Sequence, residues 1–178
     1  VAAAEGIVVG DPTDPATTMG PLANRMQFDS ARAKIAAAIA AGVPLLTGGA
    51  ETPPGLEPGL FLPPTLFGPV DPYATIAQEE VFGPVLCIHT YINEDDAVRI
   101  ANASRFGLAA YVDGADFAAA RRVAGRISAG YVRINSPGWT NAAPFGGFRQ
   151  SGNGKQYGVW GFEEFLDLKA IVANARED

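Results

Sequence analysis

Two neighbouring carboxylates, Glu79 and Glu80, lie near the middle of the 178-residue chain, within residues 78–85 (Q-E-E-V-F-G-P-V). The Gly-Pro pair that follows them restricts the backbone, because proline keeps the residue before it out of the helical region. The pattern predicts a fixed loop that enters a buried strand and presents Glu79, Glu80 and Phe82. Adjacent carboxylates seldom reach one substrate atom from opposite sides, which disfavours glycosidase chemistry. A solvated acidic turn is the alternative for this segment alone.

Cys87 and His89 are the only cysteine and the only histidine, and they stand two residues apart in an apolar run. In a strand they would share one face, but two ligands without a third do not make a metal site, so we expect none. Burial would raise the pKa of the Cys87 thiol, and no motif positions a base for it. A Ser-His-Asp arrangement would need His89 in the same buried strand. We therefore assign no catalytic residue to this chain.

The composition excludes several classes of protein. The 13 Lys and Arg residues face 19 Asp and Glu, and the net charge of −6 argues against a nucleic-acid surface and against docking on anionic membranes. We find no run of about 18 apolar residues that could span a membrane. The single cysteine permits no internal disulfide and favours a cytoplasmic location. The first six residues resemble the end of a helix already begun, not a signal peptide.

The first half of the chain predicts one long helix and two short strands. Apolar residues at three- and four-residue steps predict an amphipathic helix over 25–41, and Asn24 with Gln27 resembles a capping box at its start. Residues 43–47 predict a short strand. Residues 60–67 predict another, which two prolines either confine to a sheet edge or interrupt.

The second half alternates strands with helices. Strands are predicted at 85–91, 108–112 and 131–135, and the helices between them begin after the caps Asn93 and Asp116. Such a series implies right-handed crossovers and the α/β class: an open, mostly parallel sheet with helices on both faces. A helix around 162–166 and a short strand at 169–173 are expected to close the chain, and we see no domain boundary.

Residues 136–158 are irregular and rich in glycine, and they follow the carboxyl end of a predicted strand, where open parallel sheets bind ligands. The G-N-G at 152–154 begins like a dinucleotide fingerprint, but a tyrosine stands where the third glycine belongs, so we discount phosphate binding there. Trp139, Phe145 and Phe148 fit two interpretations equally well. They line an apolar pocket, or they are core residues that anchor the loop.

Residues 78–85 resemble the E-E-x-F-G-P-V motif of the NAD(P)-dependent aldehyde dehydrogenase superfamily, and the resemblance extends over essentially the whole chain. Further segments agree with the family in order and spacing: V-G-D-P (9–12), M-G-P-L (19–22), P-T (64–65), A-N (101–102), F-G-L-A (106–109), 130–135, P-F-G-G-F (144–148) and S-G (151–152). One motif would be weak evidence, whereas this ordered set is specific.

The resemblance implies roles for four side chains. In this family the position of Glu80 accepts hydrogen bonds from the hydroxyls of the nicotinamide ribose of NAD or NADP, and the position of Phe82 packs beside the nicotinamide. The position of Phe145 lines the aldehyde tunnel. Trp139 is a candidate substrate contact, because the loop 136–143 shapes the tunnel mouth.

The resemblance also implies that residues 1–178 are a single partial domain, the C-terminal part of an aldehyde dehydrogenase catalytic domain. Residues 167–178 would form a strand or tail used in homo-oligomerisation. The catalytic cysteine, which forms a thiohemiacetal and then a thioester, and the general base would precede residue 1, since Cys87 does not align with the nucleophile. We therefore expect this segment alone not to oxidise aldehydes. A truncated, non-catalytic homologue that serves as an assembly or interaction module is the alternative. The sequence leaves the aldehyde and the choice between NAD and NADP open.

Overall fold

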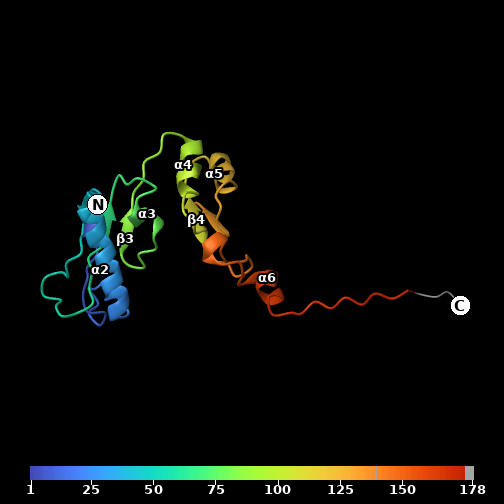
Figure 1. Ribbon diagram of the computed structural model, residues 1–178, viewed down its shortest axis with the longest axis horizontal. Coiled ribbons are helices and arrows are strands. Elements are labelled where there is room, and N and C mark those ends of the chain that lie inside the picture. The colour runs from blue at the N-terminus through green and yellow to red at the C-terminus, as the bar shows by residue number, and fades with distance from the viewer. Residues whose placement is uncertain (139, 175–178) are drawn as a thin grey trace. The chain divides into compact units, whose positions relative to one another are not determined.

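The computed structural model describes residues 1–138 and 140–174, which fall into two units, Val1–Ser104 and Arg105–Asp178. The N-terminal unit contains, in chain order, α1 (Ala2–Glu5), α2 (Arg25–Ala40), β1 (Leu45–Thr47), β2 (Thr65–Phe67), α3 (Thr75–Gln78), β3 (Val85–Cys87) and α4 (Glu94–Ala101). The C-terminal unit contains β4 (Ala109–Val112), α5 (Phe117–Ala124), β5 (Tyr131–Ile134), the 3-10 turn η1 (Arg149–Ser151) and α6 (Gly158–Glu163) (Figure 1).

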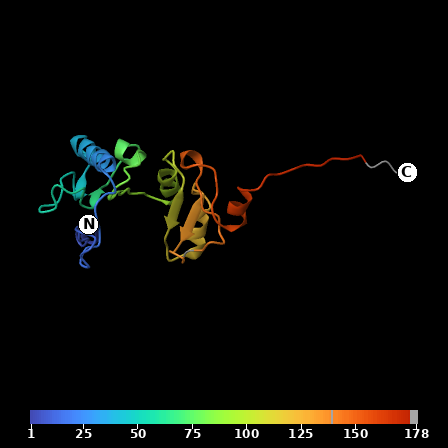
Figure 2. The same ribbon diagram turned by 90° about the horizontal axis from the view of Figure 1, so that it is seen from below.

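Helix α2 supplies much of the core of the N-terminal unit, and it lies beside α3 (Figures 1 and 2). The Asn24 side chain accepts a hydrogen bond of 2.8 Å from the backbone N–H of Gln27, which confirms the predicted start. The inward face buries Phe28, Ala31, Ile35 and Ala38 against apolar residues that include Leu62 and Phe67. Ile39, an apolar residue of the same helix, is by contrast 41% exposed.

The sheet of the N-terminal unit has the order β1-β2-β3, with β2 antiparallel to β1 and parallel to β3. The prolines before position 65 interrupt the predicted 60–67 strand, and what remains of it is the central strand, not an edge. Thr65 is fully buried; its N–H donates to the carbonyl of Pro84 at 2.8 Å, and its hydroxyl lies 2.9 Å from the carbonyl of Pro63. β3 is shorter than predicted, and it is not the buried strand expected, since Leu86 is 59% exposed; its partner is β2, not the strand at 109–112.

The C-terminal unit is built on a strand–helix–strand unit. β4 and β5 run parallel, with Ala109 opposite Tyr131 and Val112 opposite Ile134, and α5 packs against both strands. The Asp116 carboxylate caps α5 by accepting hydrogen bonds from two backbone N–H groups of its first turn. The parallel pairs in both units confirm the α/β class. No described helix is long and apolar enough to cross a membrane.

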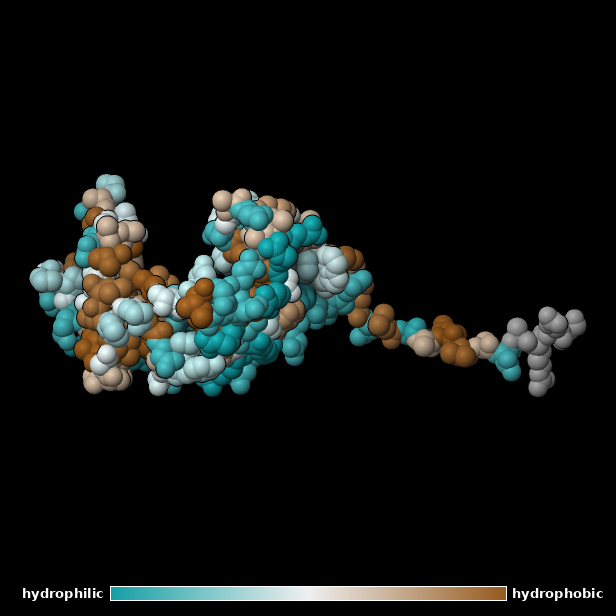
Figure 3. Space-filling model, turned by 90° about the horizontal axis from the view of Figure 1, so that it is seen from above, coloured by the Kyte–Doolittle hydropathy of each residue, from teal (hydrophilic) through white to brown (hydrophobic). Residues whose placement is uncertain are grey.

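The chain after α6 has no described helix or strand. α6 ends at Glu163, earlier than the predicted helix around 162–166, and the strand predicted at 169–173 is absent from the described residues. Leu168, Ile171 and Val172 are at least 82% exposed, and Figure 3 shows hydrophobic residues along this segment. A strand needs a partner for its backbone groups, and no described residue of this chain provides one here.

Candidate functional site

Two side chains of α2 hold the backbone of residues 79–83, which we call the carboxylate loop. Gln27 Nε2 donates to the carbonyl of Phe82 at 2.6 Å, and Lys34 Nζ donates to the carbonyl of Glu80 at 2.5 Å. The Lys34 ammonium also lies 3.9 Å from Oε2 of Glu79. The loop predicted as fixed is therefore held by contacts from a helix far away in the sequence.

The same face of α2 sets how closely the loop approaches. Gln27, Ala31 and Lys34 recur at steps of four and three residues, which places them one above another on the helix surface. A Cβ added to Gly83 would lie 3.1 Å from the Cβ of Ala31, so the loop rests directly on this face. Only half of the predicted capping box forms, because the Gln27 amide bonds to Phe82 instead of reaching back to the cap.

The carboxylate loop presents Phe82 and Glu80 to solvent. Phe82 has φ of 54° and is 68% exposed, and both the left-handed backbone and the exposed ring cost free energy. The Glu80 side chain is exposed, and within the described part of the chain its carboxylate has no hydrogen-bond or ion-pair partner. The carboxylate loop thus presents the Glu80 carboxylate, a hydrogen-bond acceptor, and the exposed ring of Phe82 from a backbone that α2 holds in place.

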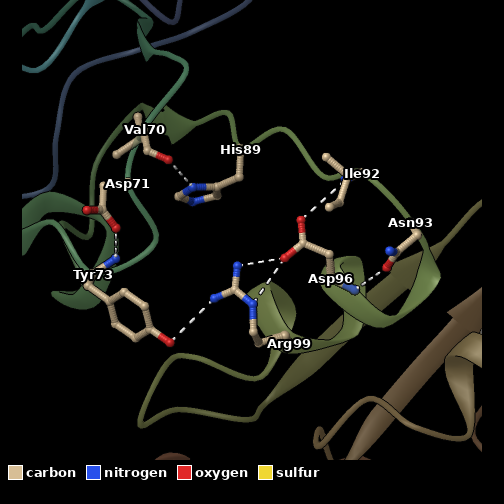
Figure 4. Close-up of polar contacts among 8 residues, drawn as sticks. All are labelled: Val70, Asp71, Tyr73, His89, Ile92, Asn93, Asp96 and Arg99. Carbon is tan, nitrogen blue, oxygen red and sulfur yellow. Dashed lines mark hydrogen bonds and ion pairs between the residues drawn. The ribbon is translucent and has the colours of Figure 1, made fainter.

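Cys87 and His89 each contact a backbone carbonyl. Cys87 Sγ lies 3.8 Å from the carbonyl of Ile76, and desolvation raises the pKa of this half-buried thiol. His89 Nδ1 lies 2.8 Å from the carbonyl of Val70, a contact that needs a proton on Nδ1 (Figure 4). Among the described residues, no group of three His, Cys, Asp or Glu side chains could hold a metal ion.

Arg99 of α4 forms an ion pair within its own helix and also contacts the turn before α3 (Figure 4). Arg99 Nη2 lies 2.6 Å from Asp96 Oδ1, and Arg99 Nη1 lies 3.5 Å from the hydroxyl of Tyr73. The other Asp96 oxygen accepts from the N–H of Ile92 at 3.2 Å, and Asn93 caps the helix. The hydrogen bond from Arg99 lowers the pKa of Asp96, and the same bond raises the pKa of Arg99.

Phe145 lies in the C-terminal unit, where it both packs and lines a cavity. Its backbone forms two hydrogen bonds with Gln156, of 2.8 and 2.7 Å. Its ring meets Tyr131 edge to face, with the centroids 5.5 Å apart. A cavity of about 530 Å³ is bordered by Phe145, Leu108 and Phe165, together with the glycine-rich segment. Trp139, the other expected substrate contact, lies outside the described residues.

The glycines of the segment 144–156 allow backbones to meet. A Cβ on Gly130 would lie 1.8 Å from the carbonyl oxygen of Gly146, and a Cβ on Gly146 would lie 2.2 Å from that of Gly154. Lys155 Nζ donates to the carbonyl of Gly147 at 2.8 Å and lies 5.3 Å from the centre of the Phe148 ring. At Gly146 this wall of the cavity is therefore close-packed backbone, and a side chain cannot be added there without displacing it.

Two side chains at the end of β5 hold the backbone at and before the start of the loop 136–143, and neither contact was predicted from the sequence. Arg133 donates from Nη2 to the carbonyl of Pro137 and lies 5.7 Å from the centre of the Tyr111 ring. Asn135, at φ of 51°, accepts from the N–H of Gly114 at 2.8 Å and donates to its carbonyl at 3.0 Å. An asparagine directly after a strand tolerates left-handed backbone, which is the one signal the sequence offered.

Comparison with known proteins adds to this geometry. The family model "Aldehyde dehydrogenase family" matches residues 1–171. The chain belongs to the aldehyde dehydrogenase family. A curated relative, 3-succinoylsemialdehyde-pyridine dehydrogenase from a Pseudomonas species, is 46% identical over 166 residues, which are 93% of this chain and 35% of the relative. This aldehyde dehydrogenase chain thus spans about a third of the length of the curated relatives it matches.

Solved aldehyde dehydrogenases share the fold. A mutant of aldehyde dehydrogenase C from Pseudomonas syringae, in complex with NAD+ and octanal, is 50% identical with a TM-score of 0.94; the match covers 99% of this chain and 36% of that one. A betaine aldehyde dehydrogenase from Staphylococcus aureus, in complex with NAD+, is 35% identical with a TM-score of 0.89, over 94% of this chain and 34% of that one.

Proposed function

We propose that this chain is part of an enzyme that oxidises an aldehyde to a carboxylic acid with NAD or NADP, and that it supplies contacts to the cofactor and the substrate. The observation that carries the proposal is the carboxylate loop, where Glu80 and Phe82 face solvent from a backbone held by α2. The relatives crystallised with NAD+, one of them also with octanal, support this choice of cofactor and substrate.

The chemistry of the loop fits a nicotinamide nucleoside. The Glu80 carboxylate is acceptor-only when ionised, so it suits the two hydroxyls of a ribose. The exposed ring of Phe82 offers an apolar face to a flat heterocycle and keeps water from it. When bound, the nicotinamide supplies the acceptor for the two electrons that leave the aldehyde. In this proposal Glu80 and Phe82 bind and orient, and neither breaks a bond.

The substrate contacts are proposed for Phe145 and Trp139. Phe145 borders a cavity of about 530 Å³ in its unit, and an aromatic wall suits the carbon chain of an aldehyde. The start of the loop that carries Trp139 is held by Arg133 and Asn135. In this proposal the loop shapes the entrance that the aldehyde passes.

The nucleophile is proposed to come from sequence outside these 178 residues. Cys87 is half-buried and its pKa is raised, so its reactive thiolate is disfavoured. A cysteine and a general base elsewhere would form and hydrolyse the thiohemiacetal-derived thioester, and residues 1–178 alone would be inactive. We also propose that residues 1–178 form part of one catalytic domain, that 167–178 join copies into a homo-oligomer, and that the enzyme is cytoplasmic.

A second candidate function is non-catalytic. The segment after α6 exposes Leu168, Ile171 and Val172 almost completely, which favours a role as an assembly or interaction module of a truncated homologue. Intact mass measurement of the purified material separates the two functions. A second polypeptide that carries a cysteine nucleophile supports the enzyme, whereas this chain alone supports the module.

The cofactor role is tested by Glu80→Gln in an enzyme in which this segment is joined to the rest of the family domain. Replacing charge-assisted hydrogen bonds by neutral ones is expected to cost about 1–1.4 kcal/mol, or roughly a 5- to 10-fold rise in the KM for the cofactor, with lower turnover. Glu51→Gln is the control, since its side chain is 86% exposed and pairs only with Arg32 in the described contacts. An unchanged cofactor KM in Glu80→Gln would contradict the proposed role.

A further inference from the structure

We propose that Lys34 is a positioning residue for the cofactor contacts: it neutralises Glu79 and fixes the peptide of Glu80, so that only Glu80 is left to bind the ligand. The inference rests on the proposed cofactor role of Glu80 and Phe82. It deepens that role by assigning different tasks to the two adjacent carboxylates.

The contacts of Lys34 divide the carboxylate pair. Its ammonium donates to the carbonyl of Glu80 at 2.5 Å and lies 3.9 Å from the carboxylate of Glu79. The Glu80 carboxylate receives neither contact. A lysine ammonium has three donors on a compact charge, so it can serve a carbonyl and a carboxylate at once. Without it, two like charges on neighbouring residues would repel each other and favour other loop conformations.

Hydrogen bonds to two backbone carbonyls explain how Lys34, on a distant helix, can orient the side chains of Glu80 and Phe82. Lys34 holds the carbonyl of Glu80, and Gln27 holds the carbonyl of Phe82, so the Glu80–Val81 and Phe82–Gly83 peptide planes, which follow these two residues, are both held. Fixing these planes sets the directions in which the side chains of Glu80 and Phe82 leave the backbone. The left-handed conformation of Phe82 needs such support, because its surroundings must hold a conformation that is unfavourable for phenylalanine.

The surroundings of Lys34 strengthen the contact. The Lys34 side chain is 30% exposed and that of Glu79 is 45% exposed. Both border an apolar groove of about 550 Å³ formed with Ala37, Tyr73 and Ile76. A charge pair at the edge of an apolar groove is less screened than one fully in water. By contrast, Arg32 on the same helix pairs with the far more exposed Glu51, away from the loop.

The test uses the full-length enzyme and compares Lys34→Met with Lys34→Arg and with the control Arg32→Met, which removes the same charge from the same helix. Lys34→Met is expected to raise the KM for NAD+ about 3- to 10-fold, the loss of one charge-assisted hydrogen bond, with the aldehyde KM and the melting temperature close to wild type. Lys34→Arg is expected to recover most of this loss. Arg32→Met is expected to leave both KM values unchanged.

A double variant tests whether Lys34 acts through Glu80. In Glu80→Gln, adding Lys34→Met is expected to raise the cofactor KM much less than it does in the wild type, because both changes affect one contact. Full additivity would overturn the inference, as would an unchanged cofactor KM or an equal rise in the aldehyde KM in Lys34→Met. If Glu80→Gln alone is silent, the proposed cofactor role fails and the inference fails with it. If only Lys34→Met is silent, the inference alone fails.

Discussion

Gly130 stands where the start of β5 meets the glycine-rich segment, and Gly130→Ala tests whether that close approach holds the C-terminal unit together. An added Cβ would lie 1.8 Å from the carbonyl oxygen of Gly146, whereas ordinary contact begins at 3.4 Å. The two backbones must therefore separate by about 1.6 Å. The obstacle is backbone, so no side chain can rotate away to make room.

The cost follows from the hydrogen bonds at this contact. The N–H of Gly130 and the N–H of Phe148 both donate to the carbonyl of Gly107, at 3.0 and 2.9 Å, and the N–H of Tyr131 donates to Leu108 at 3.1 Å. A shift of this size breaks two or three of these bonds. At about 0.5–1.5 kcal/mol for each bond, the free energy of unfolding should fall by about 2–4 kcal/mol.

Urea unfolding of the full chain, followed by far-ultraviolet circular dichroism, measures this loss. Gly138→Ala is the matched control, because a Cβ there meets nothing within 4 Å. It should change the free energy of unfolding by less than about 0.5 kcal/mol. If Gly130→Ala were as stable as Gly138→Ala, the close packing of β5 on the segment 144–147 would be wrong.

Three further predictions concern other parts of the chain. Cys87→Ser in the full-length enzyme should leave aldehyde oxidation nearly unchanged, because the thiol is half-buried with a raised pKa; loss of activity in a folded protein would contradict the assignment of the nucleophile elsewhere. The Asp96 carboxyl should titrate below its ordinary range in a pH titration by carbon NMR, and Arg99→Met should return it toward that range. Since the folded-state pKa of Asp96 is lowered, its contribution to stability is present above the unfolded-state pKa and is lost as pH falls through the folded-state pKa; equal titration in both proteins would refute this. The 178-residue chain alone should self-associate through apolar residues such as Leu168 and Val172, and light scattering that shows a monodisperse monomer would argue against this.

Local sequence determined the three capped helices α2, α4 and α5 and where they begin. Asn24, Asn93 and Asp116 were predicted as caps, and each side chain accepts a hydrogen bond from a backbone N–H two or three residues later. Such bonds depend only on neighbours within one turn, so a single sequence suffices to predict them. The ordered motifs likewise identified the family, and Glu80 and Phe82 are exposed as predicted, although the strand that follows them is not buried.

Contacts between distant residues decided the rest. Gln27 was predicted to complete a local capping box, yet its amide bonds to Phe82, 55 residues away, and Lys34 reaches Glu80, 46 residues away. No short-range pattern encodes such partners, and none encodes the pairing of β3 with β2. The left-handed backbone of Phe82 shows the reason most clearly. Phenylalanine disfavours that conformation by itself, so it exists only because tertiary contacts from α2 hold the loop in place.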